Sequence, residues 1–331
     1  MLTIAIPTYN RKDCLLSSLK VLLPQLTPDC HLLILDNCSD EPVENGVRSL
    51  LQQYPRVNGR IVRHPVNVGA GANLLRAFEL CETEWLWIMG DDDEVALGGV
   101  EKVFSYLVRY PKCVFLNFND GYRKAERTIL TTGLYDFVDH IDCWPTIAFM
   151  SGGIYRAPMM RPHLRYGYRM MHTHYPQAAV LLSAIGGSGM CCLSHERVTG
   201  VHTKAPVESQ LNPILLYMGC MSLIELPMDW RTSRLLAKRI RWSPPGVGII
   251  PVWSRVFLMT RTDQETGRTV YQYDQICHRF FWDANCLEKI EMALLRLSFL
   301  MPRFFNIVYD WLRWVARKKP VVMFDIKDCR S

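Results

Sequence analysis

The chain has 331 residues, of which 49% are hydrophobic and 21% charged, and its net charge is +6. This composition predicts a soluble globular protein, long enough for one large domain with an appendage or for two domains. The charge excludes a dedicated nucleic-acid binder, whereas a membrane surface or an anionic nucleotide remains a compatible partner.

Export and membrane insertion are not expected from the sequence. The chain enters an apolar run at Leu2 without a basic n-region, and no apolar run is long enough to span a bilayer. The twelve cysteines form no paired CxxC framework, which favours free thiols in a reducing compartment. We therefore expect a cytoplasmic protein.

The N-terminal part alternates between short apolar runs and amphipathic segments. Strands are predicted at 2–6, 32–35, 60–63 and 85–89. Helices are predicted between them at 12–26, 43–53 and 70–82. We expect Pro7 to end the first strand. This β-α-β order predicts an α/β fold with a mostly parallel sheet and helices on both faces.

Polar residues follow each of the four predicted strands. They are Thr8, Tyr9, Asn10 and Arg11, then Asp36 and Asn37, then Asn67 and Gly69, then Asp91, Asp92 and Asp93. The carboxyl ends of parallel strands meet at one edge of the sheet, where open α/β sheets bind ligands. A nucleotide pocket is therefore the favoured interpretation.

The three aspartates after the fourth strand also suggest a metal site. Adjacent carboxylates repel, and their hard oxygens suit Mg²⁺ or Mn²⁺, which often also hold substrate phosphates. An Asp-rich surface turn is the alternative. The N-terminal segment has neither GxxxxGK[ST] nor GxGxxG, so P-loop and dinucleotide sites lack their glycines.

The motifs resemble, as an ordered set, family 2 glycosyltransferases with the GT-A fold. They are Ile6-Pro7-Thr8-Tyr9-Asn10-Arg11, Leu35-Asp36-Asn37-Cys38-Ser39-Asp40, Asn67-Val68-Gly69 with Asn73, and Gly90-Asp91-Asp92-Asp93. The resemblance covers roughly residues 1–200. It implies a GT-A (Rossmann-like) domain that binds a nucleotide-diphosphate sugar and Mn²⁺ or Mg²⁺, and transfers the sugar to an acceptor hydroxyl with inversion.

The resemblance also assigns roles to residues. Thr8 and Tyr9 would line the base and ribose pocket, and Asp36 would accept a hydrogen bond from the base. The other donor-binding residues would be Pro7, Asn10, Arg11, Asn37, Asn67, Gly69, Arg76 and Asp91. The alternatives are an aromatic cap for Tyr9, a turn for Asp36 and a helix-face salt bridge for Arg76.

Gly90 stands where the family pattern has its first aspartate. The register of metal ligands is therefore open: Asp92 is favoured, with Asp91 and Asp93 as further candidates. His202 is a candidate third ligand and Lys204 a candidate phosphate contact, with surface positions as the alternative for both.

The second half of the N-terminal region continues the pattern. A helix is expected at 100–110, irregular chain at 119–145 and a helix at 177–185. Strands are expected at 113–118, 151–156 and 190–193. The resemblance places an acidic general base shortly before Gly186, where this sequence has none.

Two histidines lie where that base would be. His174 is the predicted base and His172 the second candidate, because histidine exchanges protons near neutral pH and both could reach the same space if the segment is extended. The alternative is that they contact substrate or cap the next helix without proton transfer.

The C-terminal region, 205–331, is predicted to be mainly helical beyond the catalytic domain of 1–204. Helices are expected at 213–226, 229–241 and 272–315. The basic, aromatic segment Phe304–Lys319 predicts contact with an inner-membrane surface or with a dimer partner.

These observations favour an inverting, metal-dependent glycosyltransferase. Its acceptor would be a saccharide, lipid-linked by analogy with bacterial O-antigen and lipopolysaccharide enzymes. A nucleotidyltransferase and a non-catalytic sugar-binding protein of the same fold are the alternatives. The sequence names neither the sugar nor the nucleotide base.

Overall fold

The computed structural model describes residues 1–119, 126–142, 144–199 and 219–241, with single positions between 286 and 301. The described residues up to 199 and from 222 to 241 form one compact unit. Residues 219–221 and the positions from 286 on belong to a second unit. No helix in the described ranges is long and apolar enough to cross a bilayer.

The first unit is built on one eight-stranded sheet with the order β3-β2-β1-β4-β7-β5-β8-β6. Its strands are β1 (Leu2–Thr8), β2 (Cys30–Asp36), β3 (Asn58–Arg63), β4 (Trp85–Ile88), β5 (Cys113–Asn117), β6 (Ile129–Thr132), β7 (Gly153–Arg156) and β8 (Met190–Leu193). Strands β1 to β4 pair in parallel, as do β5 and β8. Strand β7 is antiparallel to both β4 and β5, and β6 is antiparallel to β8. The predicted mostly parallel sheet is confirmed.

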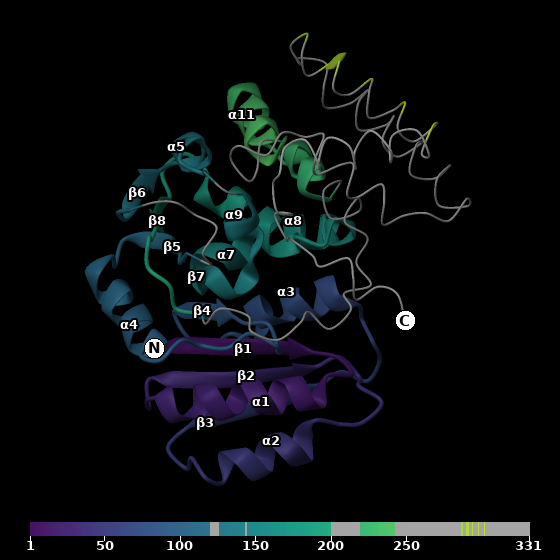
Figure 1. Ribbon diagram of the computed structural model, residues 1–331, viewed down its shortest axis with the longest axis vertical. Helices are drawn as coiled ribbons and strands as arrows, with labels where there is room; N and C mark the ends of the chain where they lie inside the picture. The colour runs from purple at the N-terminus through teal and green to yellow at the C-terminus, as the bar shows by residue number, and fades with distance from the viewer. Residues whose placement is uncertain are drawn as a thin grey trace, which may run out of the picture. The chain divides into compact units, whose positions relative to one another are not determined.

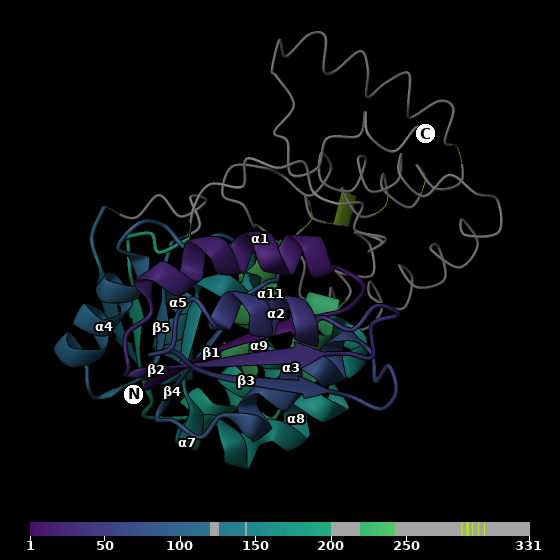
Figure 2. The same ribbon diagram turned by 90° about the horizontal axis from the view of Figure 1, so that it is seen from below.

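Helices cover both faces of this sheet (Figures 1 and 2). Leu2, Ile4 and Ile6 of β1 pack in one apolar core with α1, α2 and α4. The other face carries α3, whose residues Leu75 and Phe78 are fully buried. The main helices are α1 (Lys12–Leu22), α2 (Glu44–Leu51), α3 (Ala70–Leu80), α4 (Gly99–Arg109), α8 (Leu164–Arg169), α9 (Pro176–Ile185) and α11 (Trp230–Arg241).

Strand β1 does not end at Pro7, contrary to our expectation. It continues to Thr8, and Pro7 lies opposite Leu35 of β2. The pairing of β1 with β4 ends at Ala5, whose carbonyl accepts a bond from the Met89 N–H. The backbone groups of alternate residues in a strand point to the same neighbouring strand, so those of Pro7, like those of Ala5, point toward β4. Because the pairing with β4 has ended by Pro7, its missing N–H removes no hydrogen bond of the sheet.

The segment expected to be irregular, 119–145, contains regular structure in its described residues. These are β6, the helix α5 (Leu134–Asp139) and the start of α6 (Trp144–Ala148). Strand β6 was missed because its side chains are mostly half-exposed or exposed, so it lacks the apolar run of a central strand.

Helices α5 and α11 pack together within the first unit, since Nη2 of Arg239 lies 2.9 Å from Asp139 Oδ1. The expected helix at 229–241 is thus confirmed as α11. Of the predicted helix at 213–226, residues 219–226 are described, and they end in a 3-10 turn at Leu223–Glu225. The Phe304–Lys319 segment and most of 272–315 lie outside the described residues.

Candidate functional site

Four loops meet at the carboxyl edge of β1 to β4, as the parallel register requires. The Thr8 hydroxyl donates a 2.7 Å hydrogen bond to Oδ2 of Asp91, which joins the end of β1 to the loop after β4. The Asn37 N–H donates to the Thr8 carbonyl at 3.0 Å, which adds the end of β2. The Asn37 side-chain amide donates to Asn67 at 2.8 Å, which adds the loop after β3.

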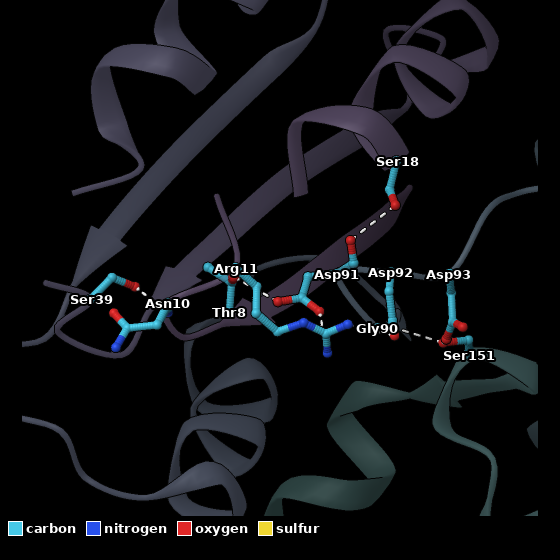
Figure 3. A network of polar contacts seen from close by, with 10 residues as sticks. All are labelled: Thr8, Asn10, Arg11, Ser18, Ser39, Gly90, Asp91, Asp92, Asp93 and Ser151. Carbon is cyan, nitrogen blue, oxygen red and sulfur yellow. Dashed lines mark hydrogen bonds and ion pairs between the residues drawn. The ribbon is translucent and has the colours of Figure 1, made fainter. Parts of the chain in front are cut away.

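The three aspartates after β4 point in different directions (Figure 3). Asp91 is 4% exposed and turns toward β1. Its Oδ1 lies 3.1 Å from Nη1 of Arg11. Burial raises the pKa of Asp91 to about 6, although the hydrogen bond from Thr8 and the charge of Arg11 both lower it.

Asp93 turns inward and is held by Ser151. The Ser151 hydroxyl donates to Oδ2 of Asp93 and accepts a 2.8 Å bond from the Gly90 N–H. A Cβ at position 90 would lie 2.7 Å from that same Asp93 oxygen. A side chain at position 90 would therefore require the Asp93 carboxylate, which Ser151 holds, to shift, and glycine at this position avoids that displacement.

Asp92 is the member of the trio that faces solvent. Its side chain is 44% exposed, and its Oδ2 accepts a 2.6 Å bond from Nη2 of Arg11. Within the described residues no group of three or more His, Cys, Asp or Glu side chains is placed to hold a metal ion. A divalent ion held by one carboxylate, waters and substrate phosphates fits Asp92, whereas Asp91 and Asp93 already bind protein groups.

Asn10 shapes the loop after β1. It has a positive φ of 54°, a conformation that asparagine tolerates well. Its N–H donates to the Ser39 hydroxyl at 2.9 Å, and its side chain exchanges two hydrogen bonds with Asp40. The loop after β2 is thereby fixed against the loop after β1.

Asn37 and Asn67 shape the loop after β3 in the same way. Oδ1 of Asn37 accepts from the Val68 N–H at 3.0 Å, and Oδ1 of Asn67 accepts from the Gly69 N–H at 2.8 Å. Gly69 has a φ of 85°, where a side chain would be strained, and directly precedes α3. Asn37, Asn67 and Gly69 thus lie at the site, where they fix the conformation of the loop after β3.

Asp36 is 1% exposed, and both of its oxygens are used by the protein. Oδ1 accepts from the Ser39 N–H at 2.9 Å, and Oδ2 lies 2.6 Å from Nη1 of Arg63. Burial alone would raise the pKa of Asp36, but the hydrogen bonds from Ser39 and the contact with Arg63 outweigh it and lower that pKa. Sequence reasoning missed Arg63, which ends the predicted strand RIVR and is one-third exposed.

Tyr9 and Arg76 occupy different surroundings. Tyr9 is 42% exposed beside the site, which leaves its ring accessible. Arg76 pairs with Glu79 one turn along α3 at 2.5 Å, and Glu79 also accepts a bond from Tyr168. Arg76 is thus held in a helix-face ion pair in this structure.

The two candidate histidines lie in a tight turn between α8 and α9. His172 belongs to a 3-10 helix, Met171–Thr173, and His174 follows with a φ of 62°, so the segment is not extended as we had assumed. A Cβ on Gly71 would lie 3.4 Å from the Met171 carbonyl, which places this turn beside the start of α3. Burial and the neighbouring charge of His172 lower the pKa of His174.

The sequence did not identify Ser151 as a residue of the site. Ser151 was recognised only as part of a strand-like segment, although its hydroxyl orders the aspartate turn. His202 and Lys204 lie outside the described residues.

Residues 3–157 match a family model described as Glycosyl transferase family 2. The chain is 26% identical over 117 residues to TuaG of Bacillus subtilis, a glycosyltransferase assigned to teichuronic acid biosynthesis. It is 31% identical over 111 residues to the abequosyltransferase RfbV of Salmonella typhimurium. These matches cover 35% and 32% of this chain and 44% and 32% of the two relatives, which is less than two thirds of their length.

Two solved structures share the fold. The similarity to S. aureus TarS 1-349 in complex with UDP-GlcNAc has a TM-score of 0.54 at 12% identity, over 83% of this chain and 80% of that chain. The similarity to the mannosyltransferase PcManGT of Pyrobaculum calidifontis in complex with GDP-Man and Mn²⁺ has a TM-score of 0.50 at 10% identity, over 91% and 87%. These similarities confirm the predicted GT-A fold.

Proposed function

We propose that this chain, whose residues 3–157 match the model of Glycosyl transferase family 2, transfers a sugar from a nucleotide-diphosphate sugar to a saccharide acceptor. The observation that supports this most is the meeting of the loops after β1 to β4 around Asp92. One exposed carboxylate and one guanidinium lie side by side there, at the edge where α/β sheets bind nucleotides.

The donor would lie across these loops. Tyr9 offers an exposed ring for the base, and Arg63, whose side chain is one-third exposed, offers a polar group in place of the enclosed Asp36. Arg11 is close enough to Asp92 to neutralise charge on a diphosphate bound there. Asp92 would hold Mn²⁺ or Mg²⁺, and the bound ion would offset the charge of the departing diphosphate.

The acceptor hydroxyl would lose its proton to His174, whose neutral form is favoured by its lowered pKa. The hydroxyl oxygen would then attack the anomeric carbon while the bond to the diphosphate breaks, with inversion. His172 is the second candidate for this base. We place catalysis in residues 1–204. Within 205–331, α11 packs on α5 of the first unit, and we assign the Phe304–Lys319 segment to contact with a membrane surface or a partner copy.

The biological setting is proposed from the relatives. TuaG is named for teichuronic acid biosynthesis and RfbV as an abequosyltransferase. From these names we propose a surface polysaccharide, such as an O-antigen unit, built on a lipid-linked acceptor. The protein would then work at the cytoplasmic face of the inner membrane.

Thermal unfolding with nucleotide sugars tests the proposal. UDP-, dTDP-, GDP- and CDP-sugars are each added with Mn²⁺ or with EDTA, and a ligand that binds the folded state raises the midpoint. We expect a shift with one nucleotide that needs Mn²⁺ and is lost in Asp92→Asn. The matched control is Asp29→Asn, which removes an exposed carboxylate just before β2, at the opposite edge of the sheet.

Two results would contradict the proposal. Absence of any shift in the native chain would favour a non-catalytic protein of the same fold. A metal-dependent shift with nucleoside triphosphates in place of nucleotide sugars would favour a nucleotidyltransferase.

A further inference from the structure

A long stretch of the chain contains no acidic residue. Between Asp142 and Glu196 the sequence has no Asp or Glu, but it has four arginines and four histidines. This stretch therefore contributes four of the six net positive charges of the whole chain. Arg156 is paired with Glu84 at 2.5 Å, but the other three arginines lie within nine residues, 161–169, and such a cluster of positive charge attracts anionic ligands.

Two of these arginines lie exposed along one helix face. Arg165 and Arg169 are four residues apart in α8 (Leu164–Arg169), so they lie on the same side of this helix, and Arg161 precedes them in a 3-10 turn. Arg161 donates to the carbonyls of Phe78 and Cys81 and thereby ties this end of the segment to the end of α3. Arg165 and Arg169 are exposed and have no acidic partner among the described residues.

Aromatic rings border the same face. The guanidinium of Arg165 lies 4.8 Å from the centre of the Tyr166 ring and donates to the Tyr166 hydroxyl at 3.0 Å. The Tyr166 ring is in turn stacked on His163, with 6.3 Å between ring centres. Flat rings next to fixed guanidinium groups suit a ligand that combines sugar rings with anionic groups.

The face of α8 that carries Arg165 and Arg169 extends toward the candidate site. Helix α8 runs alongside α3 (Figure 1), and a Cβ on Gly167 would meet the Leu75 side chain. Arg161 contacts the end of α3, whereas the Met171 carbonyl lies near Gly71 at its start. Helix α8 is therefore antiparallel to α3, and Arg169 is at the end of α8 that approaches His172 and the carboxyl edge of the sheet.

The charges facing this surface leave it positive. The acidic side chain that α3 presents toward α8 is Glu79, which accepts a bond from Tyr168 and pairs with Arg76 at 2.5 Å. Its charge is therefore already neutralised.

We propose that Arg165 and Arg169 form a binding surface for carboxylate or phosphate groups of the acceptor saccharide, so that the acceptor is an anionic glycan. This inference rests on the proposed function only where it identifies the bound glycan as the acceptor. The binding itself requires neither a donor nor a metal, and it can therefore be measured without turnover.

The experiment measures glycan binding to the full chain by calorimetry in EDTA at low salt. The anionic probes are α-1,4-linked hexagalacturonate and a glycerol phosphate hexamer, and maltohexaose is the neutral comparator. The variant is Arg165→Gln with Arg169→Gln. The matched control is Arg48→Gln with Arg60→Gln, which also removes two exposed arginines, but ones paired with Glu44 and Glu82 elsewhere on the first unit.

We expect at least one anionic probe to bind and maltohexaose to bind more weakly. The α8 variant should bind that probe about 3- to 30-fold more weakly, since each exposed charge contact contributes up to about 1 kcal/mol, and the control should bind it as the native chain does. Binding should weaken with added salt.

Several results would overturn the proposal. They are no binding of either anionic probe, equal binding of maltohexaose, or an equal loss in the control variant. Binding of phosphatidylglycerol vesicles that depends on Arg165 and Arg169, with glycan binding unchanged, would assign the surface to a membrane. Failure of the proposed function would appear separately, as a native chain that shows no thermal shift with any nucleotide sugar.

Discussion

The guanidinium of Arg11 bridges two neighbouring carboxylates, those of Asp91 and Asp92, just after the end of β4. Nη1 of Arg11 lies 3.1 Å from Oδ1 of Asp91, and Nη2 lies 2.6 Å from Oδ2 of Asp92. Burial lowers the pKa of Arg11, but the hydrogen bond to Asp92 and the two negative charges raise it overall. Arg11 is therefore the counter-ion of this cluster when no metal is bound.

Replacing Arg11 with methionine should destabilise the chain and favour metal binding. Asp91 is buried, and losing a charge-assisted bond to it should lower the free energy of unfolding by about 1–3 kcal/mol. Because Asp91 and Asp92 then lack a cation, Mn²⁺ without nucleotide should raise the unfolding midpoint more in Arg11→Met than in the native chain. Urea unfolding and a thermal shift with Mn²⁺ measure the two effects.

Arg48→Met is the control for this prediction, because its partner Glu44 is exposed and such pairs contribute little. An Arg11 variant with native stability and a native response to Mn²⁺ would show that Arg11 is not the counter-ion.

The sequence predicted the carboxyl edge of the sheet because its signals are local. Short apolar runs followed by polar residues specify parallel strands and where they end. The sequence could not predict that Asp91, Asp92 and Asp93 point in three directions, because the partners that orient them are far along the chain. Arg11 and Ser151 lie on opposite sides of the aspartates in sequence and meet them only after the sheet has formed.

The same reasoning explains the role of Asp36. Its place after the predicted strand 32–35 suggested an acceptor open to a base, but Asp36 is the last residue of β2, and Arg63 of the adjacent strand encloses it. Cross-strand pairs depend on register, which the sequence pattern alone does not give. The turn of His172 and His174 was likewise unpredictable, since a 3-10 turn leaves no periodic signal.

A side chain at position 90 should disrupt the aspartate turn. In Gly90→Ala the new Cβ would approach Oδ2 of Asp93 to 2.7 Å, against a carboxylate fixed by Ser151. We expect a loss of about 1–3 kcal/mol of unfolding free energy, as for overpacking of a fixed site. Gly187→Ala is the control, because a Cβ there meets no atom within 4 Å.

Gly90→Asp should also disrupt the aspartate turn, although it restores the first aspartate of the family pattern. We expect weaker Mn²⁺-dependent donor binding in this variant, measured by thermal shift. A gain in metal affinity would show that the turn adapts to a side chain and that our explanation of Gly90 is wrong.

Arg63→Met should lower stability in a pH-dependent manner. The lowered pKa of Asp36 contributes stability that is fully present above the unfolded-state pKa, about 3.9, and is lost as the pH falls through the folded-state pKa. Without Arg63 the pKa of Asp36 is higher than in the native chain, because only the hydrogen bonds from Ser39 then oppose the effect of burial, so the variant gains protons at higher pH. The deficit in unfolding free energy, about 1.5–3 kcal/mol near neutral pH, should therefore shrink as the solution is acidified.

Urea unfolding at several pH values between neutrality and about pH 4 measures this deficit. Arg60→Met, on the same strand but with an exposed partner, should show little change at any pH. A deficit in Arg63→Met that stays constant with pH would mean that Arg63 acts through packing and not through the charge of Asp36.

His174→Gln should reduce kcat while leaving donor binding intact. Loss of a general base typically costs about 10²–10⁴ in rate, whereas the donor loops lie on β1 to β4 and are not altered. The pH profile of the native enzyme should have its acidic limb below the ordinary histidine pKa, about 6.5, because burial and His172 both lower the pKa of His174. In His172→Gln that limb should move to higher pH, since the removed side chain contributes part of the lowering. A merely structural role for His172 would change the amplitude of the profile without moving its limb, and native activity in His174→Gln would assign the proton transfer to another group.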